Sequence, residues 1–284
     1  LDVSSLTPPR VSLLSAANIV PVPVATGEDP SKPRRWESGF TVDSEGCEVS
    51  EVYIYCNPDP AIVKTADHGG EIITYIPFVV ISSETCSTFP NKRDFWGRAT
   101  RKLILAESKR LEAELWNGTL GNPALTGWTN FAGTPTEPTT ITAAGNQDAA
   151  EGLSILDQAI GDCSAGRGMI HIRPILLQQL MLNNVVRREG NVYLSPMDNI
   201  VVPGRGYPGT GPAGQAVGAT EWMYGHPGIV EVRHSEIIYT PRQDDISAAI
   251  QRDTNDYTVW AERVTHVVLD YSCCVVTTEV NTTI

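Results

Sequence analysis

The sequence lacks a run of apolar residues long enough to cross a bilayer, which takes about 18 consecutive positions. Its first residues, Leu1-Asp2-Val3-Ser4, show neither an initiator Met nor the basic-then-apolar pattern of a signal peptide. We therefore expect that the earliest residues were removed or not included, and that the chain is neither secreted nor inserted in a membrane.

Basic residues are few. Lys and Arg number 21 against 33 Asp and Glu, so the net charge is −12. Proteins that bind nucleic acid specifically gather Lys and Arg into patches that neutralise phosphates. The basic residues here are scattered, and the densest group, 92–110, alternates with Glu. Sequence-specific DNA recognition is therefore not expected, whereas a container that only encloses DNA would need no such patch.

Signatures of chemistry are also missing. The six Cys form no Cys-x-x-Cys pair, and the five His are too scattered for zinc-ligand spacing. We favour small buried thiols in a reducing cytosol, with a Cys47–Cys56 disulfide across a hairpin as the alternative. No Gly-x-Ser-x-Gly or Walker pattern occurs. The sequence therefore predicts no catalytic, cofactor-binding or metal site.

Two segments invite a functional interpretation. The glycine-rich stretch 204–211 could cradle a phosphate, but no helix start follows it, and we favour a mobile or interface-forming loop. The carboxylates of Asp253, Asp256 and Glu262 could act as acid and base. Arg252 and Arg263 are interleaved with them, which favours ion pairs instead.

The start of the chain reads as an arm followed by a hairpin. Residues 1–38 are rich in Pro and small polar residues, so no regular packed element fits there. The runs 49–56 and 72–81 are rich in β-branched and aromatic residues, with a turn-prone stretch at 57–70 between them. We predict an extended arm and then a long hairpin with an exposed tip.

The strongest element is a helix over about 94–117, with Asp94 as N-cap and Gly118 at the left-handed position after its end. About 24 residues at roughly 1.5 Å each give a rod of roughly 36 Å. Helical spacing predicts a buried stripe of Trp96, Ala99, Leu103, Ile104, Leu111 and Leu115. The opposite, charged face would carry Arg98, Arg101, Lys102, Glu107, Lys109, Arg110, Glu112 and Glu114.

The rest of the chain mixes helices and strands. A helix is expected over 148–160, ended by Gly161, and another from Pro174 to near Gly190. Strands are expected at 169–173, 191–194, 199–202, 221–224, 229–239, 258–271 and 274–280. The predicted class is α+β, with helices in the middle of the chain.

Several stretches resemble the major capsid proteins of tailed bacteriophages, most closely those that infect actinobacteria. The first runs from Tyr75-Ile76-Pro77-Phe78-Val79-Val80 through Cys86-Ser87-Thr88-Phe89 to Glu112-Ala113-Glu114-Leu115-Trp116-Asn117-Gly118. Others are Arg34-Arg35-Trp36-Glu37-Ser38-Gly39, Ala249-Ile250-Gln251-Arg252-Asp253-Thr254-Asn255-Asp256 and Trp260-Ala261-Glu262-Arg263. The resemblance spans nearly the whole chain.

This resemblance implies the Hong Kong 97-type fold, an α+β capsid fold. The implied parts are an N-terminal arm (1–38), an extended E-loop hairpin (39–82), a peripheral domain with the spine helix (83–147), an axial domain (148–240) and returning peripheral strands (241–284). Contacts between subunits are expected at Arg35, Trp36, Lys64, His68, Arg98, Arg101, Glu107, Tyr207, Arg252 and Asp253. Some family members crosslink a hairpin Lys to a neighbour's Asn; Lys64 is suitably placed, but no Asn partner or catalytic Glu can be matched.

The implied function is a non-enzymatic shell subunit. It would assemble in the host cytoplasm into pentamers and hexamers of an icosahedral virion capsid around double-stranded DNA, without binding a specific sequence. Scaffold, portal and decoration proteins are the implied partners. An encapsulin-type nanocompartment shell, which shares the fold, remains the alternative, followed by a soluble enzyme with an unfamiliar site.

Overall fold

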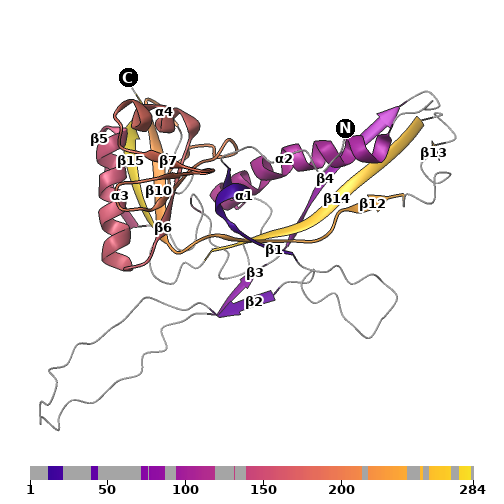
Figure 1. Cartoon of the computed structure of the whole chain (residues 1–284), viewed down its shortest axis with the longest axis horizontal. Helices are drawn as coiled ribbons and strands as arrows, with labels where there is room; N and C mark the ends of the chain where they lie inside the picture. Colours follow the sequence, from indigo (N-terminus) through magenta and orange to yellow (C-terminus); the bar gives the residue numbers. More distant parts are fainter. Residues whose placement is uncertain are drawn as a thin grey trace, which may run out of the picture.

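Two β-sheets and one long helix organise the molecule. The computed structural model describes residues 12–21, 40–43, 72–75, 77–86, 94–118, 131, 139–212, 217–241, 250–251, 256–269 and 275–282. Figure 1 shows helix α2 lying along the first sheet, while helix α3 covers a face of the second sheet, at the other end of the molecule. The α+β class expected from the sequence is confirmed.

The first sheet is built around one long strand. Strand β14 (Asp256–Val268) pairs with four others, β4 among them, and β1 extends the sheet in parallel beyond β11. These neighbours are β1 (Asn18–Pro21), β4 (Phe78–Cys86), β11 (Glu231–His234), β12 (Ile238–Thr240) and β13 (Ile250–Gln251). The predicted strand 229–239 is in fact two strands, β11 and β12. At Ser235 the side-chain hydroxyl, in place of the backbone carbonyl, accepts from the Val264 N–H of β14 at 3.1 Å, which interrupts the backbone hydrogen-bond ladder.

Helix α2 (Phe95–Asn117) has the predicted ends. The Asp94 carboxylate accepts from the Gly97 N–H at 2.8 Å, and Gly118 takes a left-handed φ of 59° while its N–H donates to Glu114. These are local bonds, so the sequence pattern locates them well. A side chain other than Gly at 118 would be strained at this φ.

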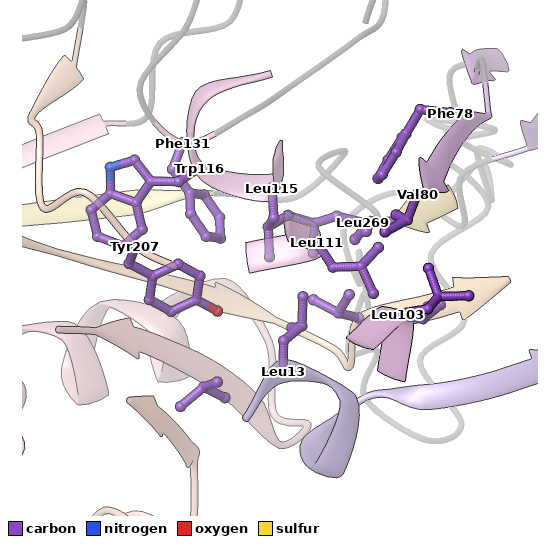
Figure 2. Close-up of a cluster of buried hydrophobic side chains, with 14 of the residues drawn as sticks. Leu13, Phe78, Val80, Leu103, Leu111, Leu115, Trp116, Phe131, Tyr207 and Leu269 are labelled. Carbon is purple, nitrogen blue, oxygen red and sulfur yellow. The ribbon is translucent and has the colours of Figure 1, made fainter. Parts of the chain in front are cut away.

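The buried side of α2 is wider than predicted. Leu103 and Leu111 are fully buried, and Figure 2 shows them with Leu115 along the surface that meets Leu13, Phe78 and Val80. Trp96 and Ile104 are only half-buried. Three residues assigned to the charged, exposed face are instead buried, and this is a correction: Glu107, Glu112 and Glu114.

The second sheet has seven strands in the order β5-β15-β10-β6-β9-β8-β7. They are β5 (Thr139–Gln147), β6 (Gly168–Ile172), β7 (Arg187–Glu189), β8 (Val192–Leu194), β9 (Ile200–Pro203), β10 (Thr220–Pro227) and β15 (Val276–Asn281). Strand β6 lies between β10 and β9 and is buried along its whole length. A strand that is covered on both faces usually has an uninterrupted apolar sequence. Gly168–Ile172 fits this pattern apart from its histidine.

Two helices pack beside this sheet. Helix α3 (Ala149–Cys163) begins with a capping box, in which the Asp148 carboxylate accepts from the Ala150 and Glu151 N–H groups. It continues past Gly161, where it was expected to end. Helix α4 (Pro174–Leu182) starts at the predicted Pro but ends eight residues before Gly190, because residues 187–189 pair with β8 as a strand.

The remaining elements are short. Strand β2 (Phe40–Asp43) pairs antiparallel with β3 (Ile72–Tyr75), and helix α1 (Leu13–Ala16) packs against α2. The predicted run 72–81 is split into β3 and β4, and the expected strand 49–56 lies outside the described residues. Residues 78–81 therefore belong to the first sheet.

Two further expectations concern cysteines and membranes. Cys163 is disulfide-bonded, so the prediction of six free thiols is wrong. The alternative pair, Cys47 and Cys56, lies outside the described residues. Among the helices described, none has the length and apolar character that a membrane crossing requires.

Candidate functional site

The two halves of the molecule meet at the C-terminal end of α2. The Glu112 carboxylate lies there and accepts hydrogen bonds from three separate parts of the chain. Its Oε1 accepts from the Leu13 N–H and the Ser108 hydroxyl, both at 3.1 Å, and its Oε2 accepts from the Gly206 N–H at 2.8 Å. Burial raises the pKa of this carboxyl group, and the backbone N–H donors act against that rise.

The glycine-rich stretch, here called the glycine loop (residues 204–211), packs tightly on α2. A Cβ at Gly206 would lie 2.1 Å from the Lys109 carbonyl oxygen, so only Gly allows this approach. The Trp116 indole N–H donates to the Thr210 carbonyl oxygen at 3.0 Å. The glycine loop is thus packed on the rest of the chain and is not mobile, and the Gly206 N–H donates to a protein carboxylate. That the loop forms an interface stays a prediction.

Aromatic rings fill the space between the glycine loop and the second sheet. Trp116 lies with its ring centroid 4.9 Å from Tyr207 and 4.8 Å from Tyr224, and Phe131 stacks on Tyr224 at 5.1 Å. Figure 2 shows Tyr207, Trp116 and Phe131 gathered at this end of α2. Large aromatic side chains bury much apolar area, which anchors the helix end to the sheet.

Two histidines, His171 and His226, pack against these rings. Tyr207 contacts His171 Nδ1 through its hydroxyl at 2.6 Å, His171 Nε2 lies 2.9 Å from His226 Nε2, and His226 Nδ1 lies 2.9 Å from the Pro227 carbonyl oxygen. Both histidines are fully buried. Their spacing in the sequence did not predict that the two histidines meet, because β6 and β10 are neighbours only in the folded sheet.

The middle and N-terminal parts of α2 are tied to the first sheet by ion pairs. Glu84 on β4 pairs with Arg98 at 2.7 Å and also with Lys102, whose hydrogen bond is the main cause of the lowered pKa of Glu84. Further along, Glu107 pairs with Arg263 of β14 at 2.7 Å. Arg263 was expected to pair with carboxylates near it in sequence, and its partner is instead 156 residues away.

Four of the ten residues predicted to contact neighbouring subunits lie in the described part of the chain. Arg98 is exposed and Arg101 half-exposed, with the latter 3.8 Å from Asp94. Glu107 and Tyr207 are 2% and 3% exposed within the single chain, and contacts of these two residues with a neighbouring subunit stay a prediction. The other six lie outside the described residues: Arg35, Trp36, Lys64, His68, Arg252 and Asp253.

One sheet face carries large apolar side chains on its surface. Val79 and Ile81 alternate along β4 with Val80, which is buried toward α2, so they lie on the face away from the helix. Trp260, opposite Ser83 in the register, shares that face and is 43% exposed. Sequence reasoning missed this patch, because an alternating strand does not reveal which of its faces is covered.

Metal-ligand clusters and surface hollows are the remaining candidate sites in the described part of the chain. No cluster of three or more His, Cys, Asp or Glu side chains there could hold a metal ion. A shallow surface hollow lies along α3 and is lined by Gln147, Ala150, Glu151, Ser154 and Ile155. It contains a single carboxylate and no nucleophile–base pair.

Comparison with solved structures identifies the fold. The chain is similar to the capsid of a native GTA particle (TM-score 0.57, 11% identity, covering 98% of this chain and 92% of that one). It is similar to the capsid of Ralstonia phage GP4 (TM-score 0.52, 10% identity, covering 98% and 93%). It is equally similar to the SrpI encapsulin of Synechococcus elongatus PCC 7942 (TM-score 0.57, 12% identity, covering 100% and 91%).

These likenesses show that the chain has the Hong Kong 97-like capsid-shell fold over almost its whole length. No protein-family model matches the sequence, and no curated protein does. At identities this low, the fold is the conclusion that the likenesses support, because one fold hosts different functions.

Proposed function

We propose that this protein is the major capsid protein of a tailed bacteriophage, forming pentamers and hexamers of an icosahedral shell around double-stranded DNA. The observation that carries the proposal is the likeness of the whole chain to subunits of phage-type capsids, including that of Ralstonia phage GP4. The motifs quoted from 75–118 and 249–263 add the resemblance to actinobacteriophages.

In this proposal, the parts of the chain have the roles that the family resemblance gives them. Residues 1–38 form an arm on a neighbouring subunit and 39–82 an extended hairpin. Helix α2 is the spine of the peripheral domain, residues 148–240 surround the symmetry axes, and 241–284 return to the peripheral domain. The separation of the described molecule into a sheet along α2 and a sheet under α3 is consistent with this division.

The contacts between subunits are proposed at the ten predicted residues, namely Arg35, Trp36, Lys64, His68, Arg98, Arg101, Glu107, Tyr207, Arg252 and Asp253. Scaffold, portal and decoration proteins are proposed as partners. Assembly takes place in the host cytoplasm, and the product is the virion capsid. The net charge of −12 supports enclosure of DNA without a sequence-specific contact.

An encapsulin-type nanocompartment is the second candidate, because the Synechococcus encapsulin is as similar in fold as the phage-type capsids. The two candidates differ in what the shell encloses. A phage shell holds DNA, whereas a nanocompartment holds a protein cargo.

The experiment that tests both candidates is electron microscopy of particles formed by the purified full chain, followed by analysis of the contents of particles isolated from the source organism. Closed shells with double-stranded DNA and a tail support the phage proposal. Closed shells with a protein cargo and no DNA favour the nanocompartment. A chain that stays monomeric by static light scattering at all concentrations and salts, and is absent from virions, contradicts both.

A further inference from the structure

The buried contact between His171 and His226 has one hydrogen-bond arrangement when both rings are neutral. The Pro227 carbonyl oxygen can only accept, so His226 Nδ1 carries the hydrogen and donates to it. His226 Nε2 is then an acceptor, so His171 donates to it from Nε2 at 2.9 Å. His171 Nδ1 is left to accept from the Tyr207 hydroxyl at 2.6 Å. Each ring thus donates one hydrogen bond and accepts one.

This histidine chain, Tyr207–His171–His226, joins elements that are far apart in sequence. Tyr207 belongs to the glycine loop, which holds the C-terminal end of α2 through Gly206 and Thr210. His171 is on β6 and His226 on β10, in the middle of the second sheet. The Tyr207–His171 hydrogen bond is therefore a polar attachment of the glycine loop, and through it of α2, to the second sheet.

An added proton does not fit this arrangement. A proton on His226 Nε2 would set two N–H groups against each other at 2.9 Å. A proton on His171 Nδ1 would require the Tyr207 hydroxyl to turn and accept, which takes its hydrogen away from its present acceptor. In either case a positive charge would be fully buried beside Phe131, whose ring is 4.7 Å from that of His171.

The described groups around the histidine chain are either apolar or engaged with other partners. Arg173, which follows β6 as the N-cap of α4, is engaged with Glu221 at 2.6 Å. On β10, Tyr224 lies against Phe131, and on β9 the apolar Val202 is opposite His171. From α2, the Glu112 carboxylate influences Tyr207 and accepts from Leu13, Ser108 and Gly206. Among the described residues, no carboxylate is hydrogen-bonded to either imidazole.

We propose that the histidine chain is an acid-sensitive latch that releases the glycine loop and the end of α2 from the second sheet when either imidazole is protonated. The proposal concerns this subunit's own fold and stands whether or not the chain builds a shell. It assigns a role to a buried pair that has no part in any contact proposed between subunits.

The direction of the pH dependence follows from the burial of the rings. Burial, and then the neighbouring His226, lower the pKa of His171 well below its usual 6.5, and burial lowers the pKa of His226 to about 4. The latched state therefore binds fewer protons than the open one. Its stability is full above the ordinary histidine value of 6.5 and is lost as the pH falls toward 4. Glu107, Glu112 and Glu221 have pKa values raised by burial, so their protonation acts in the opposite sense.

Hydrogen exchange on the purified full chain between pH 7.5 and 5 tests the latch. Protection factors are compared for amides of residues 204–211, the last turn of α2 and, as reference, helix α3. We expect protection in the first two segments to be constant above pH 6.5 and, below it, to fall about tenfold per pH unit for each proton taken up on opening. Helix α3 should keep its protection. Equal loss in all three segments means global acid unfolding and overturns the latch, as does protection that does not change with pH.

Three variants identify the titrating groups. In His226→Gln, an amide oxygen can still accept from His171, so the protein should fold and its pH dependence in the glycine loop should be at least halved. His234→Gln removes a half-buried histidine of β11 that is not part of the histidine chain. The pH dependence of protection in this variant should equal that of the wild type. Tyr207→Phe should give low protection in the loop already at pH 7.5. If His226→Gln keeps the full wild-type slope, or if Tyr207→Phe keeps the full protection, the proposal fails.

Discussion

Individual side chains on α2 show how distant parts of the chain determine what a helical residue does. Glu107 and Glu112 fall on the side that helical spacing assigns to solvent. Each is nonetheless buried by groups that arrive from elsewhere, Arg263 of β14 in one case and the Leu13 and Gly206 amides in the other. A buried carboxylate is tolerated only where hydrogen-bond donors replace water. These two residues therefore hold α2 to the distant segments that supply the donors.

Glu112→Gln tests this at the scale of one atom. The amide oxygen can replace one carboxylate oxygen, but the NH2 group at the other position would face a donor, either the Leu13 N–H or the Gly206 N–H. We expect the free energy of unfolding to fall by roughly 2 kcal/mol, because a buried donor is left unsatisfied. Urea denaturation followed by circular dichroism measures the loss. Glu189→Gln, an exposed change in β7, is the matched control and should be neutral. Equal, small effects for both variants would show that the hydrogen bonds of Glu112 do not stabilise the fold.

At the scale of elements, the glycine loop is the feature whose sequence is most misleading. A stretch of Gly and Pro without a regular pattern predicts mobility, yet Gly204 and Gly206 are needed because Tyr207 and the α2 backbone lie against them. Glycine in such a place permits close packing of backbone on backbone.

Gly206→Ala tests the packed loop. The new Cβ would lie 2.1 Å from the Lys109 carbonyl oxygen, which is helix backbone and cannot turn away. The loop must therefore move off α2, and we expect a loss of about 2 kcal/mol by thermal and urea denaturation. Gly161→Ala is the control, because no atom lies within 4 Å of its Cβ position on α3. Removing Gly from a helix should stabilise the protein by about 0.5 kcal/mol. Unchanged stability of Gly206→Ala would mean that the loop does not pack on α2 in solution.

The elements that sequence predicted best are those fixed by short-range bonds. Asp94, Gly118 and Pro174 mark helix ends through local geometry, and all three act as the patterns indicate. The end of α4 was missed, because residues 187–189 form a strand only where β8 is present as a partner. The candidate site was missed for the same reason, since Tyr207, His171 and His226 meet only through the order of the strands in the second sheet.

At the scale of the whole molecule, the described chain leaves apolar surface uncovered. Val79, Ile81 and Trp260 form a solvent-facing patch on the first sheet, and Met181 and Leu182 at the end of α4 are also exposed. Contiguous exposed apolar surface is typical of interaction sites. In the proposed shell, neighbouring copies of the chain cover such surfaces, so the free subunit should be more prone to associate than its net charge of −12 would suggest.

The hairpin provides the test that separates folding from assembly. Asp43 of β2 lies opposite Ile72 of β3, so a two-residue Asn-Gly turn can replace residues 44–71 and close the pair directly. Under the shell proposal, the replaced segment holds contacts with neighbouring subunits, including those of Lys64 and His68. The described core around α2 is built from residues outside the replaced segment, Leu103, Leu111 and Val80 among them. We expect a soluble subunit with near-normal circular dichroism and melting temperature that fails to form closed particles in electron microscopy. A second variant with residues 57–70 replaced by Gly and Ser at unchanged length separates the loss of side chains from the loss of reach. Full-sized, stable shells from the shortened protein would show that the hairpin is not an assembly element, and an unfolded product would place it in the subunit core.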